Sequence, residues 1–145
     1  MKRADIGKGE VALVKKIGFI TTNKVLAQSL VTIIKSYPEL EVEPLMLLNR
    51  DQTPLDAETL KIDAAVIDMT AGYSEELGMV WELFETLRKT LPECKILLLV
   101  SQDDMQGRET AIKAVKQKAA DDFIFYDSSL DYLFVKLLTL LKVPL

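Results

Sequence analysis

The stretch Asp63-Ala64-Ala65-Val66-Ile67-Asp68 decides the fold. Its four central residues are apolar without polar alternation, which indicates a strand covered on both faces. A second run, Lys95-Ile96-Leu97-Leu98-Leu99-Val100, has the same character. Strands of this kind are typical of parallel sheets with helices on both sides, so the chain is predicted to be an α/β protein.

Outward from these runs, short apolar segments alternate with helical patterns. Strands are predicted at residues 17–20, 42–48, 64–67, 95–100 and 122–126. Helices are predicted at residues 24–36, 54–60, 75–91, 106–119 and 129–141. Pro38 ends the first helix, and Pro54 is placed to begin the second. This alternation predicts βα units in one domain, residues 16–145, preceded by an N-terminal arm at residues 1–15.

Composition excludes several classes of function. The 145 residues are 49% hydrophobic and 28% charged, which is typical of a globular protein. Lys and Arg total 18 against 22 Asp and Glu, giving a net charge of −4. This mildly acidic balance argues against direct nucleic-acid binding, which needs a basic footprint. The sequence contains no His, so Ser-His-Asp, Cys-His and His-metal chemistry are excluded, and no metal site is predicted.

Location and redox state are suggested by two further features. Cys94 is the single cysteine, so no internal disulfide can form, and a lone thiol fits a reducing cytoplasm. We interpret it as a residue that leads into the strand at 95–100. No apolar run approaches the roughly 18 residues of a membrane span, and Lys2 and Arg3 precede no apolar signal core. We therefore expect a cytoplasmic protein without membrane contact.

Three stretches, in this order and spacing, resemble the receiver domains of two-component response regulators. They are residues 63–69, with a strand ending on Asp68; residues 87–104, with Pro92 before an apolar strand and Ser101 after it; and residues 118–124, which read Lys-Ala-Ala-Asp-Asp-Phe-Ile. The resemblance covers about residues 16–143. It implies a flavodoxin-like, doubly wound sheet with strand order 2-1-3-4-5 and a site at the carboxyl ends of the strands.

The resemblance also implies a phosphoryl-acceptor site, whose positions can be followed one by one. The acceptor aspartate is Asp68. The two acidic positions that would help to hold Mg²⁺ are Thr21 and Thr22, and neither carries charge. The hydroxyl position falls on Val100, with Ser101 one residue later, and the lysine position falls on Tyr126. The proline usual after that lysine is Asp127, whereas the aromatic position on the last strand is matched by Phe123.

These departures predict a degenerate pocket. Loss of two carboxylates and one fixed cation removes most of the electrostatic support that phosphoryl transfer needs. Simpler structural roles are also open. Asp68 is an aspartate capping a loop, while Thr21, Thr22 and Asn23 are N-cap candidates. The Tyr126 ring either fills the vacated pocket and bonds Asp68 or a backbone group, or is a core aromatic with a solvated hydroxyl.

The first hypothesis is therefore a non-enzymatic signalling module, a pseudo-receiver that acts through contacts with a signalling protein or an output domain. In the receiver family the surface of the fourth helix, fifth strand and fifth helix is a common partner and dimer face. The candidate contacts there are Phe123, Tyr132, Val135 and Leu138. A second hypothesis is a phosphorelay receiver that uses Mg²⁺ and Asp68. A third is a flavodoxin-like small-molecule binder, although residues 21–23 only faintly resemble a flavin phosphate loop.

Overall fold

The computed structural model describes residues 14–47, 52–69, 77–126 and 128–143, with the side chains of residues 77–79 left undescribed. Strands and helices alternate along the chain. They are β1 (Lys15–Ile20), α1 (Lys24–Lys35), β2 (Val42–Leu47), α2 (Thr53–Leu60), β3 (Ala64–Asp68), α3 (Leu77–Thr90), β4 (Lys95–Val100), α4 (Met105–Lys116), β5 (Asp122–Phe125) and α5 (Leu130–Leu141).

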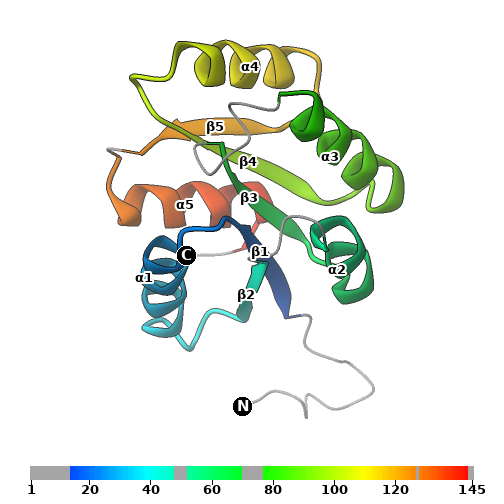
Figure 1. The fold of residues 1–145 in the computed structure, drawn as a ribbon. Helices are drawn as coiled ribbons and strands as arrows, with labels where there is room; N and C mark the ends of the chain where they lie inside the picture. The colour runs from blue at the N-terminus through cyan, green and yellow to red at the C-terminus, as the bar shows by residue number, and fades with distance from the viewer. Residues whose placement is uncertain (1–13, 48–51, 70–76, 127, 144–145) are drawn as a thin grey trace.

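The five strands form one parallel sheet in the order β2-β1-β3-β4-β5. Helices α1 and α5 cover one face, and α2, α3 and α4 cover the other (Figure 1). The central strand β3 is buried along its whole length, as its apolar sequence predicts. The predicted flavodoxin-like sheet and its strand order are therefore confirmed.

Strand alternation divides the core into two clusters. Ile17, Phe19, Ala64 and Val66 point toward α1 and α5, in a cluster that also contains Phe134. The neighbouring strand residues point the other way. Ile20, Ala65, Ile67, Leu98 and Val100 pack with α2, α3 and α4. Each strand residue is thereby assigned to one face of the sheet, and this assignment governs which side chains can meet at the strand ends.

Several boundaries differ from the predictions. β1 begins at Lys15, inside the predicted arm, while residues 1–13 of that arm lie outside the described part of the chain. Leu48, the predicted end of β2, and Glu75, the predicted start of α3, also lie outside it. α4 ends at Lys116 rather than at the predicted residue 119. Lys118 has a left-handed φ of 64°, and an α-helix cannot continue through a residue in this conformation.

The free edge of the sheet at β2 carries a proline. Lys15 N donates to Glu41 O, so odd-numbered residues of β2 face β1 and Pro44 faces the open edge. A proline there has no N–H to offer to another strand, which protects the edge from pairing with a second chain. Among the described helices, none combines the length and apolar composition needed to cross a bilayer.

Candidate functional site

The carboxyl ends of β1 and β3 bring two predicted residues together. Ile20 pairs with Ile67 in the parallel register, so Thr21 and Asp68 are the next residues on the two adjacent strands. Alternation points both side chains toward the face covered by α1 and α5. The two residues lie 47 positions apart in the sequence. They are neighbours in space because of the register between β1 and β3.

Thr21 donates a short hydrogen bond to Asp68. Its Oγ1 lies 2.6 Å from Asp68 Oδ2, and the two residues are 4% and 1% exposed. A charge-assisted O–H···O⁻ bond has this length and is stronger than a bond between neutral groups. The carboxylate is therefore held inside the protein by a neutral hydroxyl, at one of the two positions where the receiver family carries acidic residues.

The same hydroxyl also accepts a hydrogen bond from the start of α1. Asn23 N donates to Thr21 Oγ1 at 2.9 Å, and Asn23 Oδ1 accepts from Leu26 N at 3.0 Å. Asn23 is thus the N-cap of α1, as the sequence allowed. Thr21 is not a cap itself, because its hydroxyl links the cap residue to Asp68.

The described residues do not fit a Mg²⁺ site. Mg²⁺ requires several oxygen ligands in near-octahedral geometry, normally with carboxylates among them. Here Oδ2 of Asp68 accepts a hydrogen bond from Thr21, whose own oxygen is neutral and accepts a hydrogen bond from Asn23 N. No group of three or more Cys, Asp or Glu side chains suited to a metal ion occurs within the described ranges.

The remaining pocket residues divide between the two faces of the sheet. Thr22 is exposed. Val100 is fully buried among the residues facing α2, α3 and α4, and its place in the pocket stays a prediction. Ser101, one residue later, is half-buried and accepts a bond from Asp103 N at 3.3 Å, within the turn that leads to α4.

Tyr126 follows β5 directly, which ends one residue earlier than predicted. It is half-buried and packs against the α1 and α5 cluster, the face of the sheet to which Asp68 belongs. Its backbone N donates to Val100 O at 2.9 Å. A bond from its hydroxyl to Asp68 stays a prediction.

Two of the four residues of the predicted interaction face are exposed. Tyr132 and Val135 are 49% and 45% exposed, and Phe123 is half-buried, with its ring edge-on to Phe125. The expectation for Leu138 is wrong, because it is fully buried in the core. It follows Phe134 by one helical turn and therefore lies on the buried side of α5.

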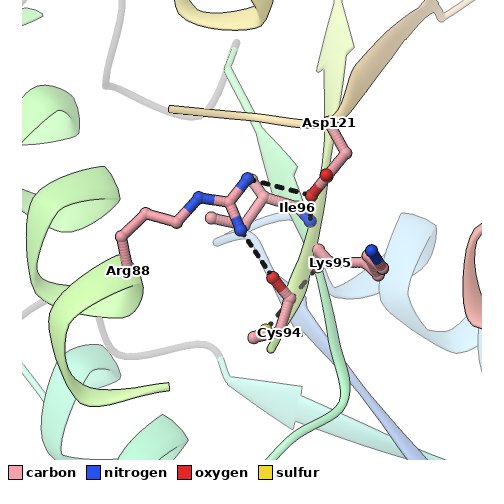
Figure 2. Close-up of polar contacts among 5 residues, drawn as sticks. All are labelled: Arg88, Cys94, Lys95, Ile96 and Asp121. Carbon is pink, nitrogen blue, oxygen red and sulfur yellow. Dashed lines mark hydrogen bonds and ion pairs between the residues drawn. The ribbon is translucent and has the colours of Figure 1, made fainter. Parts of the chain in front are cut away.

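The opposite end of the sheet holds a network that the sequence did not reveal. Arg88, in the last turn of α3, donates to Cys94 O at 2.8 Å and to Asp121 Oδ2 at 3.0 Å (Figure 2). Asp121 Oδ2 also accepts from Ile96 N at 2.8 Å. The sequence does place an arginine, Arg88, before β4 and an aspartate, Asp121, before β5. Whether the two side chains pair depends on how α3 packs on the sheet, which the sequence does not state.

Cys94 lies beside this network and is 2% exposed. Burial raises the pKa of its thiol to about 12, an effect that the Arg88 guanidinium only partly offsets. A thiol with this pKa is protonated at neutral pH and is a poor nucleophile. The structure therefore supports the interpretation of Cys94 as a core residue that leads into β4.

Comparisons with solved structures identify the architecture. A response regulator from Thermotoga maritima has a TM-score of 0.70 at 18% identity, over 90% of this chain and 99% of the other. The receiver domain of a Francisella response regulator has a TM-score of 0.69 at 21% identity, over 88% and 97% of the two chains. An adenylate cyclase from Rhodopirellula baltica has a TM-score of 0.70 at 15% identity, over 90% and 89%.

Sequence comparison adds no closer relative. No family model matches the chain, and no curated protein matches it. At identities of 15–21%, the likeness to the three solved structures is one of fold. The order of the five strands and the placement of the five helices agree with it, so the chain has the fold of a response-regulator receiver domain.

Proposed function

We propose that this protein is a signal-transduction module with receiver architecture that acts through protein–protein contacts, without phosphorylation of Asp68. The observation that carries the proposal is the 2.6 Å bond from Thr21 Oγ1 to Asp68 Oδ2. A phosphoryl acceptor must present a carboxylate oxygen beside a cation, whereas Asp68 Oδ2 accepts a hydrogen bond from a buried neutral hydroxyl. The proposal includes no catalytic activity and no cofactor.

The proposed contact surface is formed by α4, β5 and α5. Its exposed apolar residues include Met105 and Ile112 on α4, at 66% and 40%, and Tyr132 and Val135 on α5. Large apolar side chains at the surface are a feature of binding faces when they gather on neighbouring elements. The proposed partner is a signalling protein or output domain, and a second copy of the chain can use the same face.

Lys136 on α5 contacts side chains of both β5 and α5 on this face. Lys136 Nζ donates to Asp122 Oδ2 at 2.9 Å and lies 5.5 Å from the Tyr132 ring centroid. These contacts restrict the Lys136 side chain, so less side-chain entropy is lost when a partner binds this face.

Self-association and partner capture test the surface. Val135→Asp should weaken either interaction at least about tenfold, because a charge would be buried in an apolar contact. Val25→Asp is the matched control, since Val25 is 77% exposed on α1, on another surface. Sedimentation and partner binding are measured with and without a phosphoryl donor. Binding that requires the donor, or equal effects of the two substitutions, would contradict the proposal.

A further inference from the structure

The Thr21 hydroxyl connects the end of β3 to the first turn of α1. It donates a hydrogen bond to Asp68 Oδ2 and accepts one from Asn23 N, so this single hydroxyl links the two bonds. Asn23 in turn accepts from Leu26 N through its side chain and from Ala27 N through its carbonyl. Four linked hydrogen bonds thereby join a buried carboxylate to the start of a surface helix.

The first turn of α1 lacks acidic side chains that would favour the helix dipole. The first position of the helix is Lys24. A positive charge at the N-terminus opposes the helix dipole, whereas a carboxylate nearby favours it. Hydrogen bonds in a chain also polarise one another, so the charge of Asp68 strengthens the bond between Thr21 and Asn23.

We infer that Asp68 is a positioning residue for α1, holding the first turn of that helix in place through Thr21 and Asn23. The residue that the fold would offer as a phosphoryl acceptor has, in this chain, become the anchor of a helix. A change at Asp68 is then transmitted to the α1 surface, where Val25 is 77% exposed. This inference goes beyond the proposed function, because it concerns the order of α1 and not phosphorylation or partner binding.

Amide hydrogen exchange resolved by residue tests the inference. Thr21→Val removes both the donor and the acceptor at nearly constant volume. Exchange at Asn23, Leu26 and Ala27 should become about five- to tenfold faster, as expected for loss of a hydrogen bond. The matched control is Thr22→Val, an exposed neighbour, which should change these rates less than about twofold. Core amides of β4 should keep their wild-type rates in both variants.

Two conservative variants separate this role from a general effect on folding. Thr21→Ser keeps the hydroxyl and should restore wild-type exchange in the first turn of α1. Asp68→Asn keeps an acceptor oxygen but not the charge, and should accelerate exchange there about threefold. The inference is overturned if Thr21→Val and Thr22→Val have equal effects, or if Asp68→Asn changes α1 no more than it changes β4.

These results are independent of the phosphorylation test. Wild-type exchange in α1 after all these substitutions would remove the anchoring role and leave the proposed function intact. Phosphorylation of Asp68 would remove the proposed function, whatever the exchange rates of α1.

Discussion

Removing the Asp121 carboxylate should destabilise the end of the sheet opposite Asp68. Asp121 Oδ2 accepts two hydrogen bonds, from Arg88 Nη2 at 3.0 Å and from Ile96 N at 2.8 Å (Figure 2). Ile96 is fully buried, so its amide has no access to water. Asp121→Ala therefore leaves a buried donor without its side-chain acceptor, and this effect, rather than loss of the ion pair, should dominate.

The magnitude follows from the two bonds separately. A buried N–H deprived of its acceptor costs about 1–3 kcal/mol. The ion pair is partly exposed, with side chains 28% and 24% accessible, so screening limits it to about 0.5–1 kcal/mol. Asp121→Ala should thus lower the free energy of unfolding by about 1.5–4 kcal/mol. Asp121→Asn keeps an oxygen for Ile96 and should cost only about 1 kcal/mol.

Urea unfolding measures these differences. The single tryptophan, Trp81, is half-buried and edge-on to Phe84, so its fluorescence reports loss of the core. Arg88→Met, combined with Asp121→Ala in a double-mutant cycle, should give a coupling of about 0.5–1 kcal/mol. Equal destabilisation by Asp121→Ala and Asp121→Asn would refute the reasoning, because the bond to Ile96 would then contribute nothing.

Three further predictions concern single positions. Burial raises the pKa of the Cys94 thiol to about 12, so the thiol should react with a thiol reagent only on unfolding. Because this raised pKa belongs to the folded state, the free energy of unfolding should fall as pH rises above about 9. Cys94→Ala should reduce that alkaline loss of stability, as measured by urea titrations at several pH values. Gly18→Ala should lower the free energy of unfolding by about 1–3 kcal/mol, because the new Cβ would lie 3.1 Å from methyl groups of both Ile62 and Leu47. An unchanged urea midpoint would contradict this and show that these side chains can move aside. Lys61→Gly should stabilise by about 0.5–1 kcal/mol, since Lys61 caps α2 with a φ of 55°; a lower midpoint in urea would contradict this.

The fold followed from the sequence because the two central strands, β3 and β4, are apolar over nearly their whole length. Residues 64–67 and 95–100 could only be buried on both faces, and the intervening helical patterns then required a doubly wound sheet. Local signals failed where chain geometry decided the boundary. The end of α4 depends on the left-handed conformation of Lys118, which is uncommon for a residue with a side chain.

The site was predicted less completely, because its geometry depends on pairs. Thr21 and Asp68 were each identified, but their bond follows from the register between β1 and β3, which the sequence does not state. Val100 and Ser101 are consecutive at the end of β4, so an alignment shifted by one residue would place Ser101 instead of Val100, which faces α3 and α4, at the hydroxyl position. Leu138 could have been excluded from the surface by helical spacing alone, since it lies one turn after the buried Phe134.

The most direct test of the central claim is the mass of the intact protein after incubation with Mg²⁺ and a small-molecule phosphoryl donor. The Thr21 hydroxyl donates a hydrogen bond to Oδ2 of Asp68. We therefore predict no more phosphorylated species in the wild type than in Asp68→Asn. A conventional receiver domain treated in parallel shows that the donor is active. Phosphorylation of the wild type that disappears in Asp68→Asn would contradict the account.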